Sequence, residues 1–158
     1  MIILGYPGIG KSAVCKNRSG WIDLESSNFP LKTDDGVAQY CCVAMDLSDQ
    51  GKTVFVSTHE NVRKFFESVP KCGFVAVVYP KLELREEWIK RLAARYDETG
   101  LIKDRRALSR AAENYEKDIE ALMTSSLTQI QISSGHYDLK VVLRDFIVKT
   151  AEGFGILM

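Results

Sequence analysis

The chain has 158 residues, of which 46% are hydrophobic and 27% charged, which suits one compact domain and excludes a disordered or fibrous chain. Lysine plus arginine and aspartate plus glutamate each number 21, so the charge balance does not indicate a nucleic-acid partner. No apolar stretch approaches the roughly 20 residues of a membrane span, and no leader pattern precedes the first apolar run. We expect a soluble cytoplasmic protein with a single domain over residues 1–158.

Five short apolar runs predict β-strands, and they alternate with longer segments of helical period. The predicted strands are 2–5, 21–24, 53–57, 74–79 and 128–132. The third and fourth of them lack polar alternation, as expected of central strands that are covered on both faces. The pattern predicts an α/β fold with a five-stranded parallel sheet and helices on both faces.

The segments between and after these strands predict helices from the spacing of their apolar residues. The predicted helices are 37–47, 61–68, 82–98, 108–122 and 139–150. Asp34 or Asp35 could cap the first of them. Thr99 and Gly100 would join the predicted helices 82–98 and 108–122. Together these two helices suggest a short helical lid over about residues 85–110.

The cysteines give no sign of a metal site or of a disulfide framework. Cys15, Cys41, Cys42 and Cys72 show no C-x-x-C spacing and have no paired histidines nearby, as zinc sites usually require. We predict reduced thiols, most of them buried.

Residues 5–12, GYPGIGKS, fit the pattern G-x-x-x-x-G-K-[ST] and follow an apolar run directly. In such a P-loop, glycines let the backbone fold tightly, so that N–H groups converge on phosphate oxygens. Lys11 would reach the β- and γ-phosphates, and the Ser12 hydroxyl would ligate Mg²⁺. The alternative is a glycine-rich turn with an incidental lysine, which the flanking strand and helix disfavour. We predict ATP and Mg²⁺ as cofactors, with Ser12 as the metal ligand and Gly8, Ile9, Gly10, Lys11, Ser12 and Ala13 as the cofactor-binding residues.

Two acids, Asp23 and Glu25, stand at the carboxyl end of the second predicted strand, the edge where open α/β sheets bind ligands. Their spacing places them on one side of an extended chain. We predict that both bind substrate and that Asp23 has a catalytic role. The alternative is that one caps the following turn and the other is solvated. Because the third strand ends in Ser57 instead of an acid, Asp23 or Glu25 would have to supply the negative charge near Mg²⁺.

His59 and Arg63 follow the third strand and are further substrate-binding candidates. His59 could contact substrate or cap the helix that follows it. Arg63 could reach a substrate phosphate or lie on a solvated helix face.

Arginines are concentrated after the fourth strand, and planar, permanently charged guanidinium groups suit phosphate binding. The alternative is a pair of surface helices in which Glu87 and Asp97 balance the arginines at 91 and 95. We assign catalytic roles to five residues: Lys11, Asp23, Arg91, Arg95 and Arg105. The whole arginine set is Arg85, Arg91, Arg95, Arg105, Arg106 and Arg110.

These features resemble the nucleoside monophosphate kinase group of P-loop proteins, the adenylate and uridylate/cytidylate kinase relatives, with shikimate- and gluconate-kinase-like enzymes as cousins. The resemblance covers most of the chain, and small kinases of phages and gut bacteria share the same general build. It depends on the N-terminal P-loop, on the acids that end the second strand, and on the order of residues in the lid. That order is Arg91, Arg95, Arg105 or Arg106, Arg110 and Tyr115.

The chain also departs from that group. The D-G-F-P-R run after the third strand and the S-G-R-x-D-D lid sequence are both absent, so the group's substrate rules do not transfer. The resemblance implies ATP-dependent phosphoryl transfer to a small acceptor, with a nucleotide or nucleoside favoured.

Two other functions stay open at this point. One is a degenerate, non-kinase P-loop protein that binds or slowly hydrolyses ATP and regulates a partner. The other is a nucleic-acid end kinase, which the lack of a basic groove disfavours. The sequence leaves the acceptor and the oligomeric state undetermined.

Overall fold

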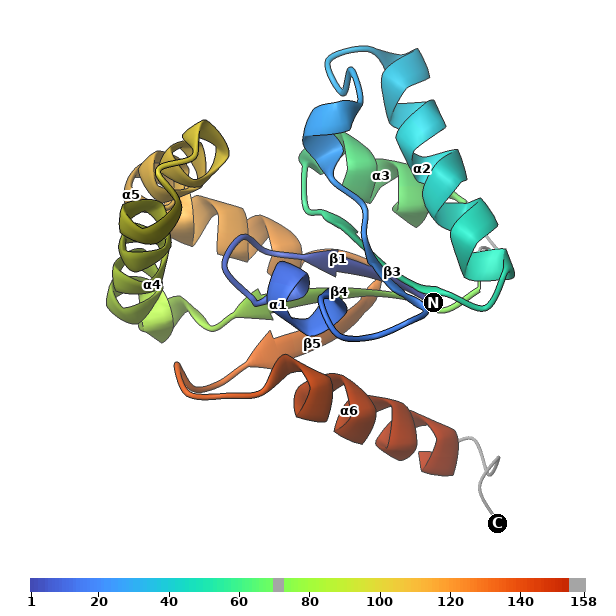
Figure 1. The fold of residues 1–158 in the computed structure, drawn as a ribbon. Helices are drawn as coiled ribbons and strands as arrows, with labels where there is room; N and C mark the ends of the chain where they lie inside the picture. Colours follow the sequence, from blue (N-terminus) through green and yellow to red (C-terminus); the bar gives the residue numbers. More distant parts are fainter. Residues whose placement is uncertain (70–72, 154–158) are drawn as a thin grey trace.

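The computed structural model describes residues 1–69 and 73–153, and a five-stranded sheet of parallel strands lies at its centre (Figure 1). The strand order is β2-β3-β1-β4-β5. The predicted α/β class and its five strands are confirmed, with shifts of one residue at the ends of β2 and β4. The strands are β1 (Ile2–Gly5), β2 (Trp21–Asp23), β3 (Thr53–Ser57), β4 (Val75–Pro80) and β5 (Thr128–Ile132).

In the described residues, six α-helices accompany the sheet, and two short 3₁₀ helices cover Ser26–Asn28 and Leu82–Leu84. The N-cap predicted for the helix at residues 37–47 is wrong. Thr33, not Asp34 or Asp35, is the N-cap, because its Oγ1 accepts a hydrogen bond of 3.1 Å from the Gly36 amide and the two acids already belong to the first turn. The helices are α1 (Lys11–Cys15), α2 (Asp34–Asp49), α3 (Glu60–Ser68), α4 (Arg85–Thr99), α5 (Ile102–Met123) and α6 (Leu139–Gly153).

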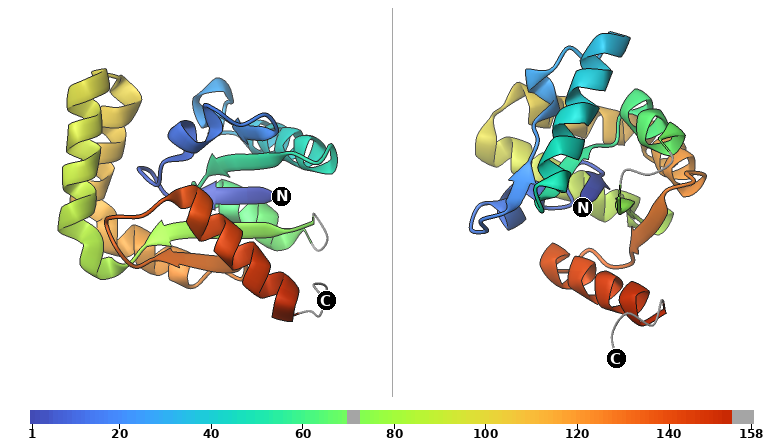
Figure 2. Two further views of the ribbon diagram at one scale, coloured as in Figure 1. Left: turned by 60° about the horizontal axis from the view of Figure 1, so that its bottom comes forward. Right: turned by 90° about the vertical axis from the view of Figure 1, so that its right-hand side faces the viewer.

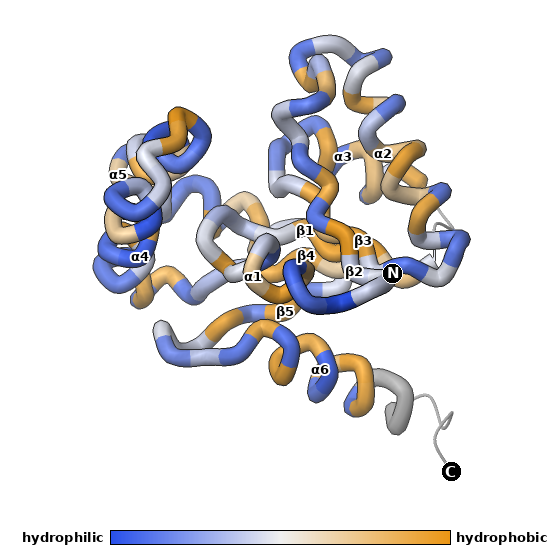
Figure 3. Tube along the Cα trace, in the orientation of Figure 1, coloured by the Kyte–Doolittle hydropathy of each residue, from blue (hydrophilic) through white to orange (hydrophobic). Residues whose placement is uncertain are grey.

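The helices cover both faces of the sheet. Helices α1 and α6 contact each other on one face, and α2, α3 and α5 lie on the other (Figure 2). Right-handed crossovers place α1 on the face opposite α2, α3 and α5, since the step from β1 to β2 runs in the opposite direction to the later steps. The apolar residues concentrate in the strands, whereas α4 is mainly hydrophilic (Figure 3).

Every residue of β1 and of β4 is buried, as are the three central residues of β3. These are the three inner strands of the sheet, so the prediction that the third and fourth strands are covered on both faces is confirmed. Because β1 is central, the loop that follows it emerges in the middle of the sheet edge formed by the carboxyl ends of the strands. That edge is where α/β sheets of this kind bind ligands.

Helices α4 and α5 pack along each other as a hairpin that stands beyond the carboxyl ends of the strands (Figure 1). The predicted junction is confirmed: α4 ends at Thr99, and Gly100 follows with a φ of +61° and donates to the Tyr96 carbonyl over 2.8 Å. A residue with this backbone conformation commonly ends a helix. The hairpin therefore places its side chains beside the loop after β1.

None of the helices in the described part of the chain has the length and apolar character of a membrane span. The cysteines differ from the prediction of mostly buried thiols, since Cys41 is buried, Cys15 is half-buried and Cys42 is exposed. Cys72 lies outside the described residues.

Candidate functional site

The loop between β1 and α1 takes the shape that its glycines allow. Gly8 and Gly10 have φ angles of +87° and +99°, in the left-handed region that favours glycine. A Cβ at Gly8 would also lie only 3.1 Å from the indole Nε1 of Trp88. A Cβ at Gly10 would meet open space, so only the backbone conformation requires glycine there.

Two backbone amides of this loop are left without a protein acceptor. The Ile9 amide donates to the carbonyl of Tyr6 over 3.3 Å. For the amides of Gly8 and Gly10, no acceptor is found among residues 1–69 and 73–153, although Gly8 is buried. Buried backbone donors are nearly always paired, so an acceptor from outside the chain fits this position. Backbone amides in tight turns of this kind form binding sites for anions.

Lys11 begins α1, and its Nζ donates over 3.3 Å to the carbonyl oxygen at the end of β1. Withdrawal from water lowers the pKa of Lys11 below its ordinary value, and the positive charges of Arg95 and Lys103 act in the same direction. The carboxylates of Asp23 and Glu25 oppose that shift in pKa. The structure therefore brings together charged groups from the loop, from the end of β2 and from the α4–α5 hairpin.

The two acids of the second strand have different partners. Asp23 ends β2, and its Oδ2 accepts a hydrogen bond of 2.7 Å from Ser12 Oγ. Glu25 forms an ion pair of 2.9 Å with Lys103 on α5. It makes no capping hydrogen bond to the 3₁₀ helix that follows, so the capping alternative does not describe it. Of these two acids, only Asp23 contacts Ser12, the predicted Mg²⁺ ligand.

His59 stands at the N-cap position of α3 but makes no capping hydrogen bond. Its Nδ1 lies 2.7 Å from Ser57 Oγ, at the end of β3. Partial withdrawal of the ring from water lowers the pKa of His59, and the charges of Arg110 and Lys11 lower it further. His59 therefore lies at the same sheet edge as Lys11, and its contact with a substrate stays a prediction.

Arg63 does not lie on a solvated helix face. Its side chain is 11% exposed and forms an ion pair of 3.0 Å with Glu67, one turn later on α3. Glu67 also accepts a hydrogen bond from Ser125. This pairing gives Arg63 a role in holding α3 to the chain segment before β5, and its contact with a substrate phosphate stays a prediction.

The hairpin arginines have more than one kind of partner. Arg85 forms surface ion pairs with Glu86 and Glu116, as the alternative of a surface helix pair expects. Arg95 pairs with the buried Asp104 at 2.9 Å, and Arg110 makes two hydrogen bonds to Asp118. Glu87 and Asp97 are therefore not the counter-charges of Arg91 and Arg95, and that part of the alternative is wrong. Arg105 is exposed, and within residues 1–69 and 73–153 it forms no ion pair.

Arg91 contacts the loop between β1 and α1. Its guanidinium donates to the carbonyl of Gly8 over 3.2 Å, to the hydroxyl of Tyr137 over 3.0 Å and to the carbonyl of Gly135 over 2.6 Å. These bonds join α4 to the loop after β1 and to the loop before α6. Contact between Arg91 and a phosphate stays a prediction.

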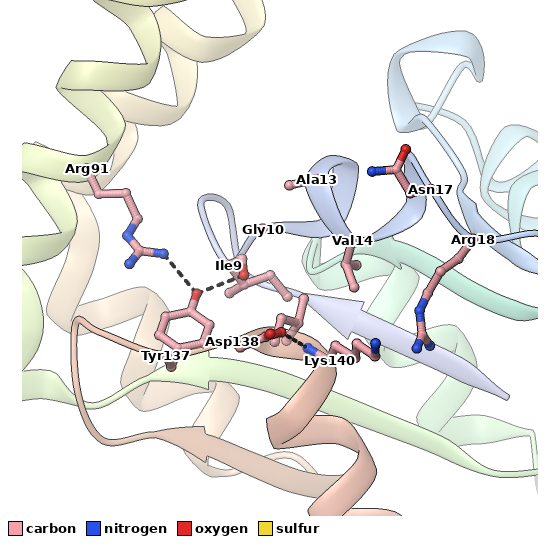
Figure 4. Close-up of a pocket in the computed structure, with 11 residues that line it drawn as sticks. Ile9, Gly10, Ala13, Val14, Asn17, Arg18, Arg91, Tyr137, Asp138 and Lys140 are labelled. Atoms are coloured by element: carbon pink, nitrogen blue, oxygen red, sulfur yellow. Dashed lines mark hydrogen bonds between the residues drawn. The ribbon is translucent and has the colours of Figure 1, made fainter.

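An open pocket of about 580 Å³ lies beside α1, between the loop after β1 and the start of α6 (Figure 4). Gly10 and Ala13 line it on one side, and Tyr137 and Arg91 lie close together on another. Burial raises the pKa of Tyr137 to about 12, while Arg91 acts in the opposite direction. The remaining lining residues are Ile9, Val14, Asn17, Arg18, Asp138, Leu139 and Lys140.

Two aromatic residues at this site have no counterpart among the sequence predictions. Trp88 fits the apolar face of a helix, and Tyr137 stands in the turn after the last strand, so neither belongs to a motif. The place of Tyr137 just beyond the carboxyl end of β5 is the one signal that could have drawn attention to it. The sequence matches no protein-family model, and a search of curated proteins finds no match.

Proposed function

We propose that the protein is a P-loop kinase that transfers a phosphoryl group from ATP to a small acceptor, with a nucleotide or nucleoside favoured, on a fold of the P-loop NTPase type. The observation that carries this proposal is the arrangement of Lys11, Ser12 and Asp23 at the end of the glycine loop. The loop follows the central strand, and Asp23 reaches Ser12 from the end of β2 at 2.7 Å.

The residues present fit Mg-ATP. Unpaired amides at Gly8 and Gly10 and the ammonium of Lys11 suit phosphate oxygens. Because Ser12 donates its hydroxyl hydrogen to Asp23, the oxygen lone pairs remain available for a metal ion. Among the described residues, no group of three or more His, Cys, Asp or Glu side chains could hold a metal. Mg²⁺ commonly takes its other ligands from phosphates and water.

The pocket beside α1 supports a nucleotide instead of a simple phosphate as the ligand. Gly10 and Ala13 belong both to the predicted phosphate-binding segment and to the pocket wall. A base and ribose would have space there, next to the aromatic ring of Tyr137 and the guanidinium of Arg91 (Figure 4). Pockets of this size commonly hold small molecules.

The chemistry would depend mainly on positioning and electrostatics. Bound ATP would supply the phosphoryl group, and the Mg²⁺ bound with it would offset part of the negative charge on that group. Lys11, which is half-buried and whose pKa is lowered by desolvation, would stabilise negative charge on the phosphates. Asp23 would hold the Ser12 hydroxyl and orient or deprotonate the acceptor. Of the hairpin arginines assigned to catalysis, Arg105 alone is exposed and without a described ion partner.

A second candidate function, a P-loop regulator with weak or no kinase activity, has one observation in its favour. Arg91 and Arg95, which were expected to contact the phosphates, are held by protein oxygens in this structure. A kinase of this kind would use Arg105 for contact with the phosphates, or would release Arg91 or Arg95 during its cycle.

A coupled assay of ADP release separates the two functions. Mg-ATP would be supplied with a panel of nucleosides, ribo- and deoxynucleoside monophosphates and small hydroxy acids, with Lys11→Ala as the blank. A kinase would show stimulation by one acceptor class that the blank lacks. ATP binding without any stimulation would favour the regulator, and stimulation by a 5′-hydroxyl oligonucleotide would favour an end kinase.

A further inference from the structure

Three consecutive carbonyl groups of the P-loop accept hydrogen bonds from three side chains outside the loop. The Pro7 carbonyl accepts from Trp88 Nε1 over 2.8 Å. The next carbonyl, of Gly8, accepts from Arg91 over 3.2 Å, and the one after it, of Ile9, accepts from the Tyr137 hydroxyl over 2.8 Å. The donors come from α4 and from the loop before α6, so these contacts join three segments that are far apart in the sequence.

The three donor side chains also hold one another. The rings of Trp88 and Tyr137 are stacked, with centroids 6.1 Å apart and planes at 7°. The guanidinium carbon of Arg91 lies 4.7 Å from the first centroid and 4.9 Å from the second. Arg91 also donates to the Tyr137 hydroxyl and to the Gly135 carbonyl. Because stacking and hydrogen bonds restrict all three side chains, their donor atoms have fixed positions.

The direction of each carbonyl fixes the direction of the next amide. A peptide unit is planar and trans, so its C=O and its N–H point in opposite directions. A bond at the Pro7 carbonyl therefore turns the Gly8 amide away from Trp88, and a bond at the Ile9 carbonyl turns the Gly10 amide away from Tyr137. Neither of these two amides has an acceptor in the described part of the chain.

We propose that Trp88, Arg91 and Tyr137 form a carbonyl clamp that holds the P-loop amides in the direction required for phosphate binding. Trp88 and Tyr137 are positioning residues, because they act on the phosphates through the peptide units that carry the Gly8 and Gly10 amides. Arg91 is a positioning residue through its bonds to the Gly8 carbonyl and to the Tyr137 hydroxyl, since the Ile9 amide of the Gly8–Ile9 peptide unit donates within the loop. The inference rests on the proposed function and adds to it a source of order for the loop. It also implies that a shift of α4 would alter the loop directly.

The test compares Tyr137→Phe with Tyr79→Phe. The first variant removes the bond to the Ile9 carbonyl but keeps the ring. The second removes a buried tyrosine hydroxyl that bonds Gln129, between β4 and β5 and outside the site. MgADP affinity would be measured by calorimetry, the exchange rate of loop amides by hydrogen-exchange mass spectrometry, and the unfolding temperature as a check on stability. Trp88→Phe, which removes the bond to Pro7 and keeps an aromatic ring, serves as a second variant.

We expect Tyr137→Phe to weaken MgADP binding about 2- to 10-fold, as the loss of one or two hydrogen bonds would, and to speed amide exchange in the loop. Tyr79→Phe should change neither the MgADP affinity nor the exchange rate of the loop amides, even if it lowers the unfolding temperature as much as Tyr137→Phe does. Wild-type affinity and wild-type loop exchange in both Tyr137→Phe and Trp88→Phe would overturn the clamp and leave the proposed function intact. Failure of the wild-type protein to bind MgADP would overturn both.

Discussion

Ser12 Oγ lies 2.7 Å from Asp23 Oδ2. This contact joins the residue that follows Lys11 to the acid at the end of β2, a strand that lies two positions away from β1 in the sheet. Strand β3, which lies between β2 and β1, ends in Ser57 and not in an acid. Asp23 is therefore the strand-end carboxylate that Ser12 contacts. This contact ties the predicted metal ligand to the predicted catalytic acid, and it makes Asp23 the first target for mutation.

Asp23→Asn is expected to lower ATP-dependent turnover at least about 100-fold, because an amide cannot take up a proton or supply negative charge near Mg²⁺. The assay is coupled ADP release at saturating Mg-ATP and acceptor. Asp97→Asn, an exposed position on α4, is the matched control and should be within twofold of wild type. Equal turnover in the two variants would contradict the role of Asp23.

Lys11→Met is expected to raise stability near neutral pH while it abolishes nucleotide binding. Folding lowers the pKa of Lys11 below 10.5. At a pH below this lowered pKa, Lys11 is charged in both the folded and the unfolded protein, and burial of the charge destabilises the folded state. As the pH rises from the lowered pKa to 10.5, the unfolded chain keeps a proton that the folded protein has released, and wild-type stability rises relative to the variant.

Denaturant unfolding of both proteins between pH 7 and pH 10.5 checks this sign. The stability advantage of Lys11→Met should be greatest at the neutral end and should shrink towards the alkaline end. An advantage that is absent at pH 7, or that grows with pH, would contradict the account of Lys11 as a desolvated ammonium.

The sheet and most helices could be predicted because their apolar spacing is a local property of the chain. Residues 5–12 likewise form a local motif, whereas the partners of Arg91 and Arg95 depend on how the α4–α5 hairpin packs. Sequence proximity suggested Glu87 and Asp97 as their counter-charges, but the structure instead uses Asp104 and the carbonyls at residues 8 and 135. Contacts between distant segments, such as Tyr137 with the P-loop, leave no pattern in one sequence.

Asp104→Asn is expected to destabilise the protein by about 1–3 kcal/mol, since Asp104 is 3% exposed and accepts from both Arg95 and Thr99. Thermal unfolding would show a fall of several degrees. Glu98→Gln, at an exposed site on α4, should change the unfolding temperature by under about 1 °C. A loss of equal size in both variants would mean that the bonds of Asp104 do not secure the hairpin junction.

Gly36→Ala is expected to destabilise the protein by about 1–3 kcal/mol, although alanine normally stabilises a helix relative to glycine by about 1 kcal/mol. A Cβ at Gly36 would lie 2.0 Å from the carbonyl oxygen of Pro30, and backbone on both sides must shift to admit it. Urea unfolding measures the effect, with Gln39→Ala on the exposed face of the same helix as the control. An increase in stability would show that the loop before α2 moves aside freely.

The most direct test of the central claim is a calorimetric titration of Mg-ATP into the wild-type protein and into Lys11→Ala. The account predicts saturable binding of one nucleotide per chain, weakened at least about 100-fold in the variant, because the ammonium is the one P-loop side chain that carries charge to the phosphates. Absence of saturable binding to the wild-type protein, or equal affinity in the two proteins, would contradict it.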